Sequence, residues 1–208
     1  MSEFNHPSLI DSFPKLNFLP ENAISIKDQT YIKTSLLGQG DTGTVHQAYL
    51  AASPSEKLVM KHYFRTDSDS RKMFTNELQV LEKLGLLSNY DSKRLIIIEK
   101  HIPGVSLSDA LLNAKSMVEV KNLKFEFLKA VNNFHEKTGF IHGDLHPGNA
   151  IINQKGEITL IDFGHSYDMR SIFWVPSKVL IKMDLRRATK NFDDAVKILK
   201  QKKNWLIT

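Results

Sequence analysis

The chain has 208 residues, no cysteine and a formal net charge of +5. Its length allows one large domain or two small lobes, and the lack of cysteine excludes a disulfide scaffold and a thiolate metal site. No apolar run approaches the roughly 20 residues of a membrane-spanning helix, and no basic stretch followed by an apolar core predicts a secretory signal peptide. The positive charge favours anionic partners, such as a nucleotide or an acidic surface.

The first half of the chain predicts a sheet with one helix. Prolines interrupt any helix in residues 1–30, which are expected to form an irregular N-terminal extension. A helix is predicted over residues 70–85. Short apolar runs predict the strands of one sheet at residues 35–37, 45–50, 58–60 and 95–99. We therefore expect residues 31–100 to form a first lobe built around this sheet.

The second half predicts mainly helices, at residues 107–115, 118–137, 177–190 and 192–203. In the second of these, apolar residues recur at spacings of three and four and form one stripe, which comprises Val120, Leu123, Phe127, Val131 and Phe134. Two short strands are predicted on either side of Lys155-Gly156. Because strands precede helices, the predicted fold class is α+β, with a small helical second lobe over residues 101–208.

A glycine-rich loop follows the first predicted strand of the sheet. Residues 38–45 read GQGDTGTV, in which Gly38, Gly40, Gly43 and Val45 form the pattern G-x-G-x-x-G-x-V. Glycine lets backbone N–H groups approach phosphate oxygens because no Cβ intervenes. A dinucleotide-binding loop would lead directly into a helix, whereas this loop leads into a predicted strand. A hairpin that covers phosphate groups is therefore expected.

A lysine and a glutamate are predicted to form a buried pair. Lys61 ends a predicted strand, and Glu77 has apolar neighbours at the four positions that share its helix face, so it should point to the core. A buried carboxylate needs a partner because its desolvation is otherwise costly. Lys61 is the expected partner, while Glu82 should face solvent.

The strongest signal is the segment HGDLHPGN at residues 142–149. It has the pattern H-x-D-L-x-x-x-N, in which Asp144 would accept the proton of an attacking hydroxyl and Asn149 would hold a divalent ion. His142 is expected to position the loop rather than to react. Asp162, in Asp162-Phe163-Gly164, comes thirteen residues after Asn149, beyond a predicted hairpin, and is the expected second metal ligand.

In order and spacing, these motifs resemble those of the protein-kinase-like superfamily over residues 36–164. The resemblance implies a two-lobed fold with a truncated C-lobe, phosphoryl transfer from ATP, and Mg²⁺ as the metal, with Mn²⁺ as the alternative. It also implies that Lys61 binds the α- and β-phosphates, and that adenine pairs with the backbone around Glu99 and His101. The sequence of residues 142–149 is similar to the corresponding segment of RIO kinases, lipopolysaccharide-core sugar kinases and short secreted bacterial effector kinases.

The chain departs from the common kinase pattern at four points. Gly143 replaces the arginine that usually binds an activation-loop phosphate, and His146 replaces a lysine found in many Ser/Thr kinases. No A-P-E motif follows Asp162, and only 44 residues follow Gly164. We therefore expect activity without activation-loop phosphorylation. The short C-terminal part leaves three hypotheses open: a Ser/Thr protein kinase, a kinase of a sugar or another small molecule, and a non-catalytic nucleotide-binding scaffold.

The C-terminal helices are strongly basic. Asp184 follows Leu180 by four residues and Ile181 by three, which places it near an apolar face of the first helix. It should either hold the backbone of the catalytic loop or pair with Arg187. Only Asp184, Asp193 and Asp194 oppose nine cationic residues, which are Lys178, Lys182, Arg186, Arg187, Lys190, Lys197, Lys200, Lys202 and Lys203. Two interpretations stay open: a solvated helix surface, or a docking surface for an acidic partner, which would be an acidic protein, RNA or an anionic membrane. The expected location is the cytoplasm, either of the producing cell or of a host cell that a bacterium secretes it into.

Overall fold

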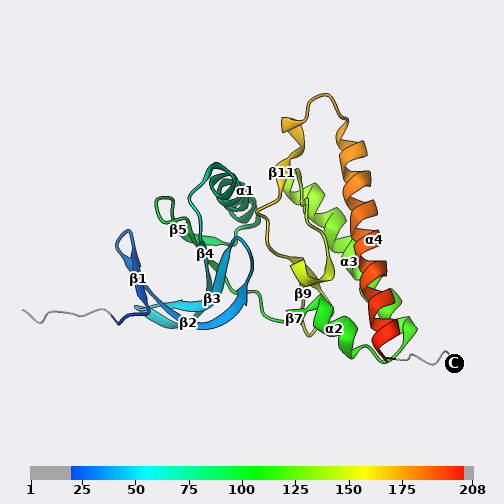
Figure 1. Cartoon of the computed structure of the whole chain (residues 1–208), viewed down its shortest axis with the longest axis horizontal. Coiled ribbons are helices and arrows are strands. Elements are labelled where there is room, and N and C mark those ends of the chain that lie inside the picture. The colour runs from blue at the N-terminus through cyan, green and yellow to red at the C-terminus, as the bar shows by residue number, and fades with distance from the viewer. Residues whose placement is uncertain (1–19, 204–208) are drawn as a thin grey trace, which may run out of the picture.

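The computed structural model describes residues 20–203 and has two lobes joined by a short connection (Figure 1). The N-lobe is a curled antiparallel sheet of six strands in the order β1-β2-β3-β4-β6-β5. Its strands are β1 (Ala23–Ile26), β2 (Gln29–Gln39), β3 (Gly43–Leu50), β4 (Ser53–Tyr63), β5 (Leu87–Asp91) and β6 (Ile96–Lys100). The predicted α+β class and two-lobed fold are confirmed.

The sheet begins earlier than predicted. Residues 1–30 were expected to be irregular, yet β1 pairs with the start of β2, with Ile26 opposite Gln29. Lys27, with φ 53°, makes the tight turn between the two strands. Burial of Ile26, which is 1% exposed, stabilises this hairpin. Residues 1–19 lie outside the described part of the chain.

Helix α1 (Ser68–Leu84) packs over the sheet and carries Glu77. The Asp67 side chain accepts a hydrogen bond from the amide of Ser70 and caps the N-terminus of the helix. Gly85 ends the helix in the left-handed conformation, with φ 70°. The predicted helix at residues 70–85 is therefore present, two residues longer at its start.

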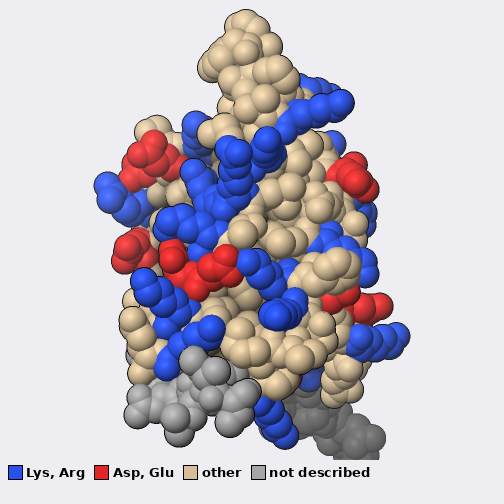
Figure 2. Space-filling view, turned by 90° about the vertical axis from the view of Figure 1, so that its right-hand side faces the viewer, with Lys and Arg blue, Asp and Glu red and all other residues tan. Residues whose placement is uncertain are grey.

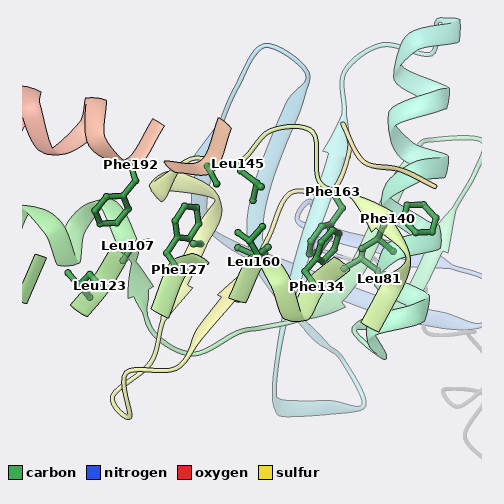
Figure 3. Packing of buried hydrophobic residues seen from close by; sticks show 14 of the residues in the cluster. Leu81, Leu107, Leu123, Phe127, Phe134, Phe140, Leu145, Leu160, Phe163 and Phe192 are labelled. Atoms are coloured by element: carbon green, nitrogen blue, oxygen red, sulfur yellow. The ribbon is translucent and has the colours of Figure 1, made fainter. Parts of the chain in front are cut away.

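The C-lobe is mainly helical. Helix α3 (Met117–Thr138) buries the predicted apolar stripe, and the Phe127 ring stacks on Phe192 at 6.0 Å (Figure 3). The remaining elements are β7 (Val105–Ser106), α2 (Leu107–Asn113), β8 (Phe140–Ile141), η1 (Pro147–Asn149), β9 (Ala150–Ile152), β10 (Ile158–Leu160), β11 (Tyr167–Asp168), η2 (Met169–Ser171) and α4 (Ser177–Lys203). The hairpin β9–β10 is the one predicted around Lys155-Gly156.

One long helix replaces the two that were predicted after Gly164. Helix α4 runs without a break across the expected boundary at residue 191. The segment contains neither glycine nor proline, so nothing in the backbone ends the first helix. The polar residue at that boundary, Asn191, instead uses its side chain to bond the backbone of Leu145. None of the helices within residues 20–203 has the length and apolar character that crossing a bilayer requires.

Candidate active site

A cleft of about 380 Å³ lies between the two lobes, a volume suited to a small-molecule ligand. The connection at residues 101–104, here called the hinge, closes one side of it. Residues from both lobes line the cleft, among them Gly38, Val45, Lys61, Glu77, Glu99, His101, Asn149 and Asp162. The fold therefore brings together most of the site residues that were predicted from the sequence.

The glycine-rich loop is the hairpin between β2 and β3, as predicted. Gly38 lines the cleft, and a Cβ at Gly38 or Gly40 would meet no atom within 4 Å, so the backbone there is open to a ligand. Gly43 has a different role. A Cβ on it would lie 2.3 Å from the carbonyl oxygen of His62, so this glycine lets β3 pack against β4.

Lys61 and Glu77 form the predicted buried pair. The Lys61 Nζ lies 2.8 Å from Oε2 of Glu77 and 3.0 Å from its Oε1. Both side chains are almost fully buried, whereas Glu82, in the same helix, is exposed. Burial alone would lower the pKa of Lys61, but the carboxylates of Glu77 and Asp162 more than offset it and raise that pKa well above its usual value. Lys61 is therefore a fixed cation in the cleft.

Tyr63 supports this pair and was missed at the sequence level. Its hydroxyl donates a hydrogen bond to the Glu77 carboxylate. Burial, and then the charge of Glu77, raise the pKa of Tyr63 and keep it a neutral donor. The signal was available, because Lys61 and Tyr63 are two residues apart on one strand and so point to the same side of the sheet.

Asp162 reaches across the cleft to the same lysine. Its Oδ1 lies 2.8 Å from the Lys61 Nζ. The backbone of Asp162 has φ 62°, in the left-handed region that is uncommon for residues other than glycine, although aspartate enters it more readily than most. Burial would raise the pKa of Asp162, but Lys61 holds it below its usual value, so the carboxylate stays ionised. Next to it, the Phe163 ring stacks on Phe134 at 5.5 Å (Figure 3).

Asp144 and Asn149 face each other across the turn of the catalytic loop. The Asn149 Nδ2 donates to the backbone oxygen of Asp144 at 2.9 Å and to its Oδ2 at 3.1 Å. The Asp144 side chain is 44% exposed and is therefore open to an incoming group. His146 Nε2 lies 3.8 Å from Asp144 Oδ2, and its Nδ1 accepts from the amide of Gly148 at 3.0 Å. His146 thus lies beside the Asp144 carboxylate.

The backbone of the catalytic loop is held by helix α4. Asp184 is buried, and its Oδ2 accepts from the amide of His142 at 3.1 Å and contacts His135 Nε2 at 2.9 Å. The first of the two interpretations of Asp184 is therefore right, and Arg187 is not its partner. Arg187 instead donates to the carbonyl of Gly143 at 2.8 Å, and Asn191 to that of Leu145 at 2.7 Å. Neither of these contacts was foreseen.

The hinge differs from the expectation that adenine pairs with the backbone around Glu99 and His101, because one of those backbone groups already has a partner. The amide of His101 donates to the carbonyl oxygen of Lys57 at 3.3 Å, so it is engaged within the protein. Ile102 also lines the cleft, and its amide makes no hydrogen bond within residues 20–203. Glu99 points into the back of the cleft, where burial, and then the charge of Glu77, raise its pKa to about 8.

No group of three or more His, Asp and Glu side chains within residues 20–203 is arranged to hold a metal ion alone. Asp162 and Asn149 nevertheless supply two oxygen donors in the cleft, since Asn149 uses its Nδ2 for bonding to Asp144 and its Oδ1 has no partner among these residues. Such a pair fits Mg²⁺, which usually keeps several waters and shares phosphate oxygens with its substrate.

The family model for the protein kinase domain matches residues 31–173, more than half of the chain. The chain belongs to the protein kinase domain family. Its glycine-rich hairpin, lysine–glutamate pair, catalytic loop and Asp-Phe-Gly segment all fall inside the match. The protein is a kinase, a phosphotransferase with a hydroxyl acceptor that uses ATP and a divalent metal ion.

Proposed function

We propose that the protein is a Ser/Thr protein kinase, which transfers the γ-phosphoryl group of Mg-ATP to a protein hydroxyl. The observation that carries this proposal is that Lys61 forms two ion pairs, one with Glu77 in the N-lobe and one with Asp162 in the C-lobe. It supports a closed arrangement in which the phosphate-binding cation and the metal-binding carboxylate already lie on the two sides of one cleft. A non-catalytic scaffold of this fold usually lacks the lysine or one of the two aspartates, whereas Lys61, Asp144 and Asp162 are all present here.

In the proposed reaction, the backbone at Gly38 and Gly40 covers the phosphates and Lys61 binds the α- and β-phosphates. Asp144 accepts the proton of the attacking hydroxyl while the oxygen of that hydroxyl bonds to the γ-phosphorus. The bond between that phosphorus and the bridging oxygen breaks, and ADP leaves. The exposed carboxylate of Asp144, held by Asn149, supports this role because a general base must reach the acceptor.

Asn149 and Asp162 are the proposed metal ligands. When bound, the ion neutralises charge on the phosphate oxygens and helps to align them. The low pKa of Asp162 supports this assignment, because the residue stays anionic at neutral pH. The contact between Asp162 and Lys61 also keeps the carboxylate aimed into the cleft.

We propose that the nucleobase lies against the hinge, between Val45 and Ile151. Glu99 and His101 line this part of the cleft, as the resemblance implied. Because the amide of His101 is engaged, the amide of Ile102 is the proposed backbone donor to the base. The proposed site of action is the cytoplasm of the producing cell or of a host cell, in keeping with the resemblance to secreted effector kinases.

One experiment separates a protein acceptor from a sugar acceptor. Purified protein is incubated with γ-labelled ATP and Mg²⁺, in parallel with dephosphorylated casein and with core-type sugars, and the labelled product is identified by mass spectrometry. Phosphoserine or phosphothreonine on casein, absent with the Asp144→Asn variant, supports the proposal. Label on the sugar with none on protein would favour the small-molecule alternative.

We also propose that an acidic partner binds helix α4. The described acidic residues of its second half are already paired, Asp193 with Lys124 and Asp194 with Lys190. Lys197 and Lys200 form no ion pair within residues 20–203, so uncompensated positive charge lies in both halves of the helix. The side chains of Lys202 and Lys203 lie outside the described part.

A further inference from the structure

The segment between η2 and α4, residues 172–176, carries two exposed aromatic side chains. Phe173 is 87% exposed and Trp174 is 70% exposed, and their rings contact each other edge to face at 5.0 Å. Figure 1 shows this segment at the end of the C-lobe that is far from β7 and the hinge. In Figure 2 the same end is an uncharged projection that stands out from the body of the molecule. Contiguous exposed apolar groups of this kind often mark an interaction surface.

Cationic side chains lie directly behind this aromatic tip. Lys178, Lys182 and Arg186 are spaced four residues apart, so they share one face of α4, and all three are exposed. None of them forms an ion pair with another residue in the described range 20–203. Figure 2 shows Lys and Arg gathered below the projection, with no acidic side chain between them and the tip.

The acidic residues near this face are already engaged. Asp184 is buried under the helix, where it bonds the amide of His142, and Asp168 is paired with Arg170 at 2.6 Å. The first turn of α4 contains Lys178 and no acidic residue. A helix N-terminus carries partial positive charge and is usually offset by an acid, so here the helix and the lysine add to each other. Unpaired positive charge therefore extends along this face of the helix up to the aromatic tip.

We propose that this surface, formed by Phe173, Trp174, Lys178, Lys182 and Arg186, binds an anionic lipid bilayer. The two aromatic rings enter the interfacial region, where amphipathic groups insert about 5–10 Å deep. The three cations lie on the anionic headgroups, which attract basic residues next to a membrane. The convex shape favours a bilayer over an acidic protein, because lipids close around a projecting tip whereas a protein partner would need a matching pocket.

Vesicle binding of the full-length chain tests this proposal without reference to kinase activity. Vesicles of phosphatidylcholine with about one third phosphatidylserine are compared with phosphatidylcholine alone by co-sedimentation. The chain has two tryptophans, so the Trp205→Phe variant leaves Trp174 as the single reporter. Binding to the anionic vesicles, a blue shift of Trp174 emission and loss of binding at high salt are the expected results.

Two variants and two matched controls locate the contact. The double variant Phe173→Ala/Trp174→Ala and the triple variant Lys178→Glu/Lys182→Glu/Arg186→Glu should each weaken vesicle binding at least tenfold. All five side chains are exposed, so both variants should fold, which circular dichroism checks. Phe125→Ala removes an aromatic of α3 that is 67% exposed, close to the value for Trp174, and Lys57→Glu/Lys72→Glu/Lys93→Glu makes the same charge change on the N-lobe. These controls should bind like the unchanged chain.

The proposal fails if anionic vesicles do not bind at low salt, or if Trp174 emission does not change when they bind. It also fails if the triple variant binds as well as its N-lobe control. Saturable binding of soluble polyglutamate through the same five residues, with no binding to vesicles, would show instead that the surface takes an acidic polypeptide.

Discussion

The guanidinium of Arg187 donates a hydrogen bond of 2.8 Å to the carbonyl oxygen of Gly143, the residue before the proposed base Asp144. Asp184 and Asn191 lie on the same face of α4 and bond the backbone at His142 and Leu145. A single helix thus fixes the loop on both sides of Asp144. Rigid support of this kind keeps a catalytic group in its productive orientation.

Replacing Arg187 with alanine should slow catalysis and leave ATP binding intact. Loss of this hydrogen bond frees the loop at Gly143, and a misplaced base raises the barrier by about 1.4 kcal/mol, which lowers kcat about tenfold. The KM for ATP should not change, since Arg187 does not line the cleft. Steady-state kinetics on one acceptor checks this. Lys190→Ala, which removes an exposed lysine bonded only to Asp194, is the control; an equal loss in both variants would refute the idea.

The partner of Lys61 is the target of a second prediction. Glu77→Ala should lower activity at least tenfold, about 1.4 kcal/mol, because the buried ammonium of Lys61 loses the carboxylate that orients it. Glu82→Ala removes a carboxylate from the exposed side of the same helix and should be neutral. Initial rates at saturating ATP distinguish the two. Near-normal activity in Glu77→Ala would show that Asp162 alone positions the lysine.

Activity should not require phosphorylation of the segment after Gly164. That segment is already held, since β11 pairs with β8 and the Ser166 hydroxyl donates to the carbonyl of His142 at 3.1 Å. Gly143 has φ 83°, and a Cβ there would lie 2.3 Å from the carbonyl oxygen of His165, so the phosphate-binding arginine of other kinases does not fit. Phosphatase-treated enzyme should keep its rate. A severalfold loss, restored by incubation with ATP, would contradict this.

The carboxyl group of Glu99 should make stability depend on pH. Its pKa in the folded chain is about 8 against 4.5 ordinarily, so over that interval the folded state holds a proton that the unfolded state has released. The contribution of Glu99 to the free energy of unfolding therefore falls as the pH rises from about 4.5 to about 8, and it stays constant at higher pH. Glu99→Gln stays neutral at every pH.

Melting temperatures of the two proteins between about pH 5 and about pH 8 test this. The difference between them isolates Glu99, because His142 and the other titrating groups are common to both. The advantage of Glu99→Gln should grow with pH, and a constant difference would show that Glu99 titrates normally.

The parts of the site that lie within short segments were predicted from sequence. The glycine hairpin, the catalytic loop and Asp162 each depend on local spacing, and helical periodicity alone identified Glu77 as the buried glutamate of α1. Contacts between distant segments were not predictable in this way. Arg187 and Asn191 act on backbone carbonyls more than forty residues away, and no pattern of residue types marks a backbone acceptor.

The errors in the fold have similar physical causes. β1 was missed because it is four residues long and depends on pairing with β2 and on burial of Ile26. The predicted break at residue 191 was wrong, because helix α4 is continuous there although asparagine is a weak helix former. In the structure Asn191 gains a hydrogen bond to Leu145, and that tertiary contact outweighs its weak local preference.

The central claim is phosphoryl transfer at the cleft between the lobes, and Asp162→Asn tests it most directly. The amide keeps the shape of the side chain but lacks the charge that pairs with Lys61 and that the metal ion requires. Mass spectrometry of an acceptor after incubation with Mg-ATP should show phosphate with the unchanged protein and none with Asp162→Asn, while circular dichroism shows that both are folded. Full transfer by Asp162→Asn would contradict the assignment of this site.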